Sequence, residues 1–445
     1  MPLNLLDILS NTILYSTIFD HLEPQDVIRL SQTCRTIYGF RGDLWNINRS
    51  LRRFVDDPIA FRTLMAQHDA IVSGSHALQF LARVKWTKSD LDVYITKDES
   101  LVAFANHLMT NEGYYFKPYE WQSPDAMKAI RDRKSEQEKW VEKLMNQDPP
   151  VITDDNMSEL GVYTLKGITG VFNFIHPKSE NRRIQLILAS VTPLYAVLTG
   201  YYATHIFNFF TWNRAYSLFP YHTFKDKDAY YTQGLTRQAG QGVEKYIERG
   251  YEFLEYGKFH KCIKNCPFRP HRRVADQFSW VLDLDTEGID GSLAAVPQSV
   301  IEYQTWGMKM HTSYWDRVDG VRVFVPSFKM DIKIVCDSSG SFRYPRIYDY
   351  QNRTWGNYIS DMKKTMGRLN GYHIGFPESK SKDWGDEDGM YRFDGEFENW
   401  YKLWEKSIMP YENIWRWQYP MLGGVEPDVT FDGKEREVRY DKMQE

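Results

Sequence analysis

Cysteine is scarce in this chain of 445 residues, which contains four, at positions 34, 262, 266 and 336. So few cysteines in so long a chain give no disulfide framework, and we expect a reducing compartment, cytoplasmic or nuclear. A secretory leader is not indicated either. The first residues lack the basic segment of a signal peptide, and Asp7 interrupts their apolar run.

An excess of basic charge is lacking as well. The 55 lysines and arginines face 59 aspartates and glutamates, which gives a formal net charge of −4. The net charge therefore gives no support for a nucleic-acid partner, and it does not decide whether the chain binds nucleic acid. Charge is absent from residues 184 to 212, but Gln185, Pro193 and Asn208 interrupt this run. A buried strand followed by a buried helix explains the run, and we expect no membrane partner.

Aromatic residues are abundant, with 29 tyrosines, 25 phenylalanines and 14 tryptophans. Such residues bury a large area each and can form interaction surfaces. Charged residues at 26% and hydrophobic residues at 42% are typical of a folded protein. The length of the chain predicts two or three domains.

A short apolar strand, a tight turn and a helix are predicted at residues 70–84. The strand covers 70–73, the turn is at Gly74 and Ser75, and the helix runs from about 76 to 84. Glycine lets a backbone approach a ligand closely, and the N–H groups at a helix start attract anions. The turn is therefore a candidate phosphate site, with an ordinary turn as the alternative.

Two acidic residues, Asp90 and Asp92, lie one residue apart on the next predicted strand. Side chains alternate along a strand, so both carboxylates point to one face while Leu91 and Val93 point into the core. Two acids on one face repel each other unless a cation lies between them, and oxygen ligands suit Mg²⁺. The alternative is a solvated strand edge.

Together, these residues resemble the signature of the nucleotidyltransferase fold, the polymerase-beta-like superfamily. The match consists of Gly74, Ser75, Asp90 and Asp92, with a spacing between Ser75 and Asp90 that slightly exceeds the commonest one. The resemblance implies nucleotide binding at Gly74 and Ser75. It also implies that Asp90 and Asp92 are catalytic residues that hold Mg²⁺.

The superfamily places a third metal-binding carboxylate on a later strand, which we expect at residues 182–188. The matching position here is Gln185, a neutral amide that cannot replace the lost charge. Two acids support weak or single-ion binding and leave a two-metal site incomplete. A nearby acid, Asp154 or Glu159, is a possible substitute. Enzyme activity therefore stays undecided.

The N-terminal segment predicts short helices with apolar residues at helical spacing. It resembles an F-box, with Ser10 standing where that family usually has proline. An F-box docks on the Skp-type adaptor of a cullin–RING ubiquitin ligase, whereas a helical lid packed on the next domain is the alternative. The implied partner-binding residues are Leu9, Ile13, Leu14, Ile18, Phe19, Leu22 and Pro24.

Residues 260–271 contain four residues of the types that bind zinc. They are His260, Cys262, Cys266 and His271. Their spacing matches no common zinc finger, and free cysteines are often buried without a metal, so we do not expect zinc here. Elsewhere, a charged helix is predicted at 125–146, a long helix from Pro193 to about Trp212, and another helix at 241–256.

We therefore predict an α+β protein with three parts. An F-box-like helical module covers 1–45, and a mixed-sheet nucleotidyltransferase-like domain covers 46–257, with a charged helical insertion at about 122–147. An aromatic-rich α+β region covers 258–445. Residues 202–208, 215–220 and 223–224 resemble fungal proteins that often join an F-box-like start to a transferase-like core.

Two functions follow from these resemblances. In the favoured one, the chain is an F-box-type ubiquitin-ligase adaptor whose degenerate transferase-like domain recognises a nucleotide, an RNA or a protein. In the alternative, it is an active Mg²⁺-dependent nucleotidyltransferase that moves a nucleoside monophosphate to an acceptor hydroxyl.

Overall fold

The computed structural model is a mixed α and β protein, as the sequence predicts. It describes residues 8–9, 12–87, 89–146, 167–232, 237–254, 268, 271–318, 321–337, 343–349, 355, 357–362 and 394–412. None of the helices in these ranges combines the length and the apolar character needed to cross a bilayer.

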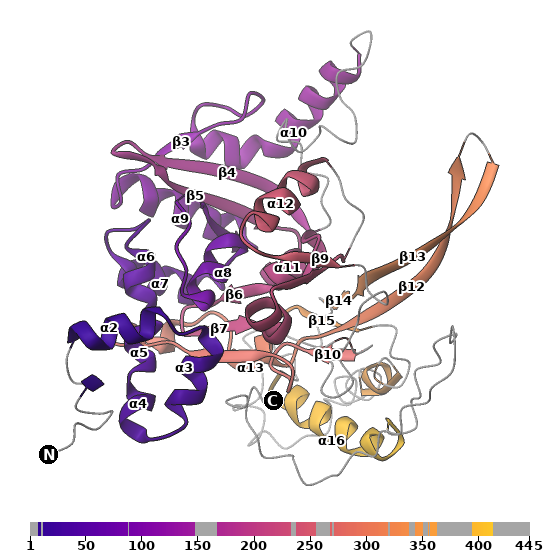
Figure 1. Ribbon diagram of the computed structural model, residues 1–445. Coiled ribbons are helices and arrows are strands. Elements are labelled where there is room, and N and C mark those ends of the chain that lie inside the picture. The colour runs from indigo at the N-terminus through magenta and orange to yellow at the C-terminus, as the bar shows by residue number, and fades with distance from the viewer. Residues whose placement is uncertain are drawn as a thin grey trace, which may run out of the picture.

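A mixed eight-stranded sheet forms the centre of the described structure (Figure 1). Its strand order is β11-β7-β6-β1-β2-β5-β4-β3. Strands β2 and β5 are parallel, and the other described neighbours are antiparallel. The strands are β1 (Ile71–Ser73), β2 (Leu91–Ile95), β3 (Tyr115–Lys117), β4 (Ile168–His176), β5 (Ser179–Ala189), β6 (Asn208–Phe210), β7 (Arg214–Ser217) and β11 (Trp280–Asp283). Because β11 follows residue 257, this sheet includes chain from both sides of the predicted boundary there.

Both faces of the sheet are covered. On one face, Val93 and Leu186 pack in a core with helices α7, α8 and α9. On the other face, Tyr94 and Ile187 pack in a second core with α11. Burial on both sides explains why the central strands are apolar runs. The helices around the sheet are α6 (Ile47–Leu51), α7 (Pro58–Gln67), α8 (Gly74–Ala82), α9 (Asp98–Thr110), α10 (Ala126–Met145) and α11 (Pro193–Gly200).

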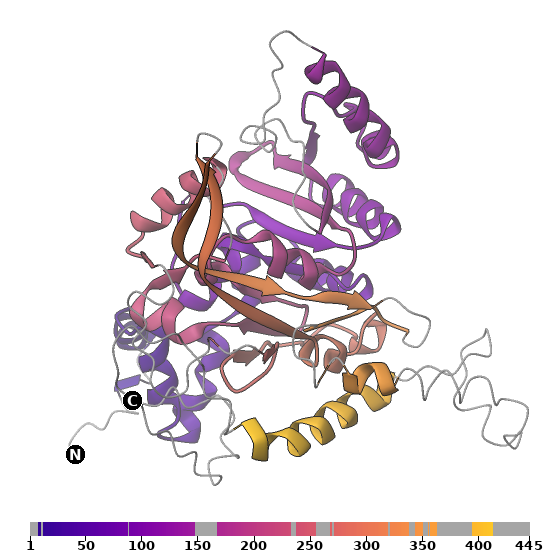
Figure 2. The same cartoon turned by 90° about the vertical axis from the view of Figure 1, so that its right-hand side faces the viewer.

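The predicted charged helix at 125–146 is confirmed as α10, which projects from the sheet in Figures 1 and 2. The Asp125 carboxylate caps it by accepting a hydrogen bond of 2.7 Å from the backbone N–H of Lys128. Its side chains are mostly exposed or half-buried, which suits a solvated helix with mixed charges.

The predicted long helix from Pro193 to Trp212 is wrong. Helix α11 begins as expected, because the Thr192 hydroxyl accepts a hydrogen bond from the N–H of Tyr195, but it ends at Gly200. A 3₁₀ turn, η1 (Thr204–Ile206), then leads into β6. The aromatic run around Phe209 and Phe210 forms a central strand instead, because it is buried on both faces between β1 and β7.

The predicted helix at 241–256 is displaced. Helix α12 (Arg237–Ile247) ends before Gly250, which has a φ of +87°, and β9 (Glu252–Leu254) follows. The left-handed backbone at this glycine ends the helix, since few other residues adopt it at low cost. Strand β9 pairs in parallel with β8 (Asp228–Tyr230). The π-helix η2 (Tyr221–Asp226) precedes β8.

Short helices form the N-terminal part, as predicted, and they pack into the same core as α7 and α8. Helix α3 begins with Pro24 at its first turn, a position where proline has no hydrogen bond to lose. Helices α6 and α7 follow these short helices and lead to β1. The N-terminal helices are α2 (Thr12–Asp20), α3 (Pro24–Ser31), α4 (Arg35–Gly39) and α5 (Arg41–Leu44).

The described C-terminal part contains a long hairpin that extends away from the eight-stranded sheet (Figure 1). Helix α16, drawn in yellow, packs through Phe397, Tyr401 and Trp404 against Trp355. The smaller elements are η3 (Gly291–Leu293) and α13 (Gln298–Glu302). The strands and the last helix are β10 (His271–Arg273), β12 (Thr305–Val318), β13 (Val321–Lys333), β14 (Val335–Asp337), β15 (Arg346–Tyr348) and α16 (Asp394–Glu412).

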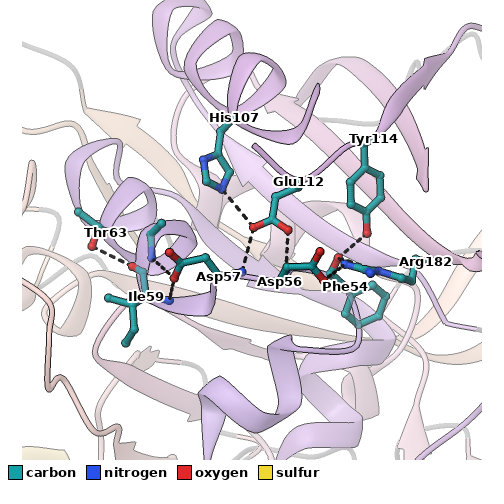
Figure 3. A network of polar contacts seen from close by, with 10 residues as sticks. Phe54, Asp56, Asp57, Ile59, Thr63, His107, Glu112, Tyr114 and Arg182 are labelled. Atoms are coloured by element: carbon teal, nitrogen blue, oxygen red, sulfur yellow. Dashed lines mark hydrogen bonds and ion pairs between the residues drawn. The ribbon is translucent and has the colours of Figure 1, made fainter. Parts of the chain in front are cut away.

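A buried carboxylate ties the loop before α7 to the end of α9 (Figure 3). The Glu112 side chain, 1% exposed, accepts hydrogen bonds from the backbone N–H groups of Asp56, at 2.5 Å, and Asp57, at 3.1 Å. The Nε2 atom of His107 lies 3.6 Å from the same carboxylate. The two backbone donors therefore satisfy the buried carboxylate, and the imidazole lies beside it.

The same loop is held to the start of β5 (Figure 3). Arg182 donates hydrogen bonds to the carbonyl oxygen of Phe54, at 2.7 and 3.1 Å, and to the Asp56 carboxylate, at 2.9 Å. The Tyr114 hydroxyl donates to the same carbonyl at 2.6 Å. These contacts fix the end of β5 that leads into the candidate site.

Candidate functional site

The Asp92 carboxylate lies directly against the backbone of Gly74. A Cβ atom at position 74 would come within 2.1 Å of Asp92 Oδ2, and the φ of Gly74 is +71°. Both the close approach and the left-handed backbone require glycine here. The predicted strand, turn and helix are confirmed as β1 and α8, and the structure brings Gly74 and Asp92 together.

Asp92 also lies beside Gln185. In the register of the sheet, Asp92 is opposite Ser73 of β1 on one side and Gln185 of the parallel strand β5 on the other. The Gln185 side-chain N–H donates a 2.8 Å hydrogen bond to the amide oxygen of Asn173 on β4. A pair of neutral amides thus stands where a third carboxylate would strengthen cation binding.

Asp90 precedes β2 and is half-buried. The Nε atom of Arg183 lies 3.6 Å from its carboxylate. Burial raises the pKa of Asp90, while the charges of Arg183 and Lys245 act against that rise. Asp90 therefore interacts electrostatically with the Asp92 carboxylate and with the positive charges of Arg183 and Lys245.

Electrostatics set Asp92 apart from an ordinary surface acid. Burial, together with the charge of Asp90, raises the pKa of Asp92 to about 8, while Lys245 and Arg183 act in the opposite direction. A divalent cation between the two carboxylates would favour their charged forms. The donor set of two adjacent carboxylates thus suits one Mg²⁺ ion, and the amide of Gln185 adds no charge for a second.

Ser75 belongs to a network that joins the turn to the loop before β2. Its hydroxyl lies 3.2 Å from that of Ser89. The buried amide of Gln79 donates to the Ser89 hydroxyl at 2.7 Å and to the Ser75 carbonyl at 3.1 Å. Its oxygen accepts from Trp86 N–H at 2.7 Å and from Arg53 at 3.0 Å. Sequence reasoning missed Gln79, because nothing in the helix pattern distinguishes it from a surface glutamine.

A cleft of about 460 Å³ opens next to Asp90. It combines three basic side chains with two acidic ones, and it lies between β3, the β4–β5 turn and α12. Gly74, Ser75 and Asp92 are not among its lining residues, so Asp90 is the predicted site residue that reaches it. Sequence reasoning missed the others, which come from segments far apart in the chain. The lining residues are Ser89, Asp90, Tyr115, Lys117, Ile175, Glu180, Asn181, Arg183 and Lys245.

Most of the predicted F-box contact residues face the interior. Leu9, Phe19 and Pro24 are buried, and Ile18 and Leu22 pack against the same core. Leu14 is 45% exposed, whereas the side chain of Ile13 lies outside the described part of the chain. From the end of α8, Arg83 donates to the carbonyls of Phe19 at 2.7 Å and Leu22 at 3.1 Å. The apolar pattern of these helices is thus used largely for packing on the following domain.

A further group of possible metal ligands lies at η2 and β8. It consists of His222, Asp226 and Asp228, whose ligand atoms lie within 4.8 Å of one another. This donor set is compatible with a divalent metal ion, and sequence reasoning missed it.

Of the residues considered for zinc, His260, Cys262 and Cys266 lie outside the described residues. Asp154 and Glu159, the possible substitutes for the third carboxylate, also lie outside them. His271 is described. Its Nδ1 atom lies 3.2 Å from the Asp349 carboxylate, and its Nε2 atom lies 3.3 Å from the Tyr401 hydroxyl.

Comparisons with known proteins identify no relative of this chain. The chain matches no protein-family model, no curated protein and no solved structure.

Proposed function

We propose that this chain binds a nucleoside triphosphate together with one divalent cation, in a degenerate nucleotidyltransferase-like site. One observation carries the proposal. The Asp92 carboxylate adjoins the backbone of Gly74, and its neighbour Asp90 lines a cleft that contains three basic side chains.

Each part of this site has a chemical role in the proposal. Asp90 and Asp92 hold the cation, for which Mg²⁺ is the expected ion, and the cation neutralises phosphate charge. Lys117, Arg183 and Lys245 supply positive charge along the cleft for the phosphates. The backbone at the Gly74–Ser75 turn adds N–H donors at the start of α8.

Binding is favoured over transfer because of Gln185. Two-metal phosphoryl transfer needs enough negative charge to hold a second cation near the attacking hydroxyl. Gln185 supplies none, and its amide is engaged with Asn173. Recognition of a nucleotide, without rapid chemistry, is the activity that this donor set supports best.

Calorimetry with ATP, GTP, CTP or UTP in the presence of Mg²⁺ tests the proposal. We expect saturable binding that weakens at least about tenfold in Asp90→Asn with Asp92→Asn, because both cation ligands lose their charge. The control is Asp98→Asn. Asp98 is an exposed acid that pairs with Arg133 and does not line the cleft. Equal affinity of the double variant and the wild type would contradict the proposal.

A transfer assay separates binding from catalysis. The protein is incubated with radiolabelled nucleoside triphosphates, Mg²⁺ and mixed acceptors. We expect no transferred label. Label transfer that disappears in the Asp90 and Asp92 double variant would instead establish an active nucleotidyltransferase.

The N-terminal helices support a second proposal, docking on a Skp-type adaptor. Leu14 of α2 and Tyr38 of α4 are large apolar side chains that are 45% and 53% exposed, so the following domain leaves both uncovered. A pull-down with the purified adaptor tests this. Capture should be lost in Leu14→Asp and retained in Leu403→Asp, an exposed leucine of α16. No capture of the wild type would exclude the docking.

A further inference from the structure

We propose that His222, Asp226 and Asp228 form a binding site for one zinc ion, separate from the Asp90 and Asp92 site. The proposal goes beyond nucleotide binding and does not depend on it. It rests on three donor side chains that the fold brings together within a segment of seven residues, 222–228.

The backbone of this segment explains the convergence. His222 and Asp226 are four residues apart in the π-helix η2, which places them on the same side of it. Lys227 then adopts a left-handed conformation, with a φ of +56°, and turns the chain into β8. This turn brings Asp228 back toward His222. Left-handed backbone is costly for lysine, so its presence here marks a conformation that the surrounding structure imposes.

The distances suit ligands of a common ion. The Nδ1 atom of His222 lies 3.6 Å from a carboxylate oxygen of Asp226 and 3.6 Å from one of Asp228. Both separations exceed the usual length of an N–H···O hydrogen bond. Donor atoms on one tetrahedral zinc ion are separated by about 3.3 Å, given metal–ligand bonds of about 2.0–2.1 Å. A small closure of the three side chains would therefore complete the site.

Burial and chemistry favour a transition metal over Mg²⁺. The His222 side chain is 3% exposed, and its ring nitrogen is a ligand that Zn²⁺ prefers and Mg²⁺ does not. Asp228 is 18% exposed, whereas Asp226 is 33% exposed and gives the site access to solvent. Three protein ligands leave a fourth position for water.

The site lies where it can stabilise the neighbouring structure. The carbonyl oxygen of Lys227 accepts a 2.9 Å hydrogen bond from Glu252 N–H, and Asp228 pairs with Glu252 in the β8–β9 sheet. Strand β9 directly follows α12, the helix that carries Lys245 into the cleft. Zinc at this position would link η2 to β8, the strand that pairs with β9, and so support the segment that follows α12.

Metal analysis of the full chain tests the proposal. The protein is stripped with EDTA, incubated with Zn²⁺, desalted and assayed for bound zinc, and its affinity is measured by competition with a chromophoric chelator. We expect one zinc ion per chain, bound at least about tenfold more weakly in Asp226→Asn and in Asp228→Asn. Zn²⁺ should also raise the Tm of the wild type, and it should raise the Tm of both variants less at the same zinc concentration.

Two control variants locate the ion. Asp90→Asn with Asp92→Asn removes the other candidate site, and Cys262→Ser with Cys266→Ser removes the two cysteines of residues 260–271. Both controls should keep the zinc ion. Zinc binding that is unchanged in Asp226→Asn and Asp228→Asn, that is lost in either control, or that is absent from the wild type would overturn the proposal. Circular dichroism checks that Asp226→Asn, a change at a partly exposed side chain, keeps the fold.

Discussion

The carboxylate of Asp92 lies in the space that a side chain at position 74 would need. The hypothetical Cβ atom of residue 74 falls 2.1 Å from Asp92 Oδ2, on a backbone with a φ of +71°. Gly74 begins α8 directly after β1, and Asp92 lies on the neighbouring strand β2. Their contact makes the identity of residue 74 a direct test of the geometry of the site.

Gly74→Ala should lower the free energy of unfolding by at least about 1 kcal/mol, because alanine is strained at this φ and its Cβ displaces Asp92. Urea unfolding measures the change. The matched control is Gly240→Ala in α12, where a Cβ would meet nothing within 4 Å. That variant should be neutral or slightly more stable, since alanine is the better helix former. Equal destabilisation by both changes would contradict the contact.

The raised pKa of Asp92 predicts a pH dependence of stability without divalent cations. Its pKa rises from the usual 3.8 to about 8, so the folded state keeps the proton that the unfolded state loses. The proton bound to Asp92 stabilises the folded state, and this stabilisation is fully present below about pH 4 and is lost as the pH rises toward 8. In EDTA, the Tm of Asp92→Asn should therefore exceed that of the wild type by an amount that grows from pH 5 to pH 8. A difference in Tm that does not change with pH would argue against the raised pKa.

Gln185→Glu should restore the missing charge beside Asp92. We expect Mg²⁺ to bind about tenfold more tightly, because a third carboxylate joins the cation ligands. The amide of Asn173 can rotate to donate to the new carboxylate, which preserves the contact between β4 and β5. Calorimetry with Mg²⁺ measures the gain. Gln67→Glu, at an exposed position of α7 and outside the cleft-lining set, serves as the control and should leave Mg²⁺ affinity unchanged.

Glu112→Gln should destabilise the fold by about 1–3 kcal/mol, because its buried oxygens accept two backbone N–H groups and an amide can replace only one of these acceptors. Urea unfolding provides the measurement. Glu99→Gln, at an exposed position of α9, is the control and should change stability by less than about 0.5 kcal/mol. Similar values for both variants would show that the network in Figure 3 does not stabilise the loop.

Sequence reasoning located the centre of the site because its signals are local. The strand, turn and helix around Gly74 follow from a short apolar run and a glycine, and the strand containing Gln185 follows from another apolar run. The position of Gln185 beside Asp92 was inferred from the resemblance, and the sheet register agrees with it.

The rest depends on tertiary contacts that no local pattern encodes. Residues 201–212 are as apolar as a buried helix, and only their position between β1 and β7 makes part of them a strand. The cleft draws Tyr115, Arg183 and Lys245 from three separate elements. The convergence of His222 and Asp228 needs a π-helix and a left-handed lysine, neither of which composition predicts.

The parallel pairing of β2 with β5 also bears on the order of folding. Asp92 and Gln185 are register partners, yet about 90 residues of chain separate them, so their pairing closes a long loop at an entropic cost. The β4–β5 hairpin closes a far shorter loop and can form earlier. We therefore expect β5, which places Gln185 beside Asp92, to pair with β2 late in folding, after the local hairpins and helices have formed. A chain released before β5 has emerged from the ribosome would carry the Gly74 and Asp92 motif without the strand that completes it.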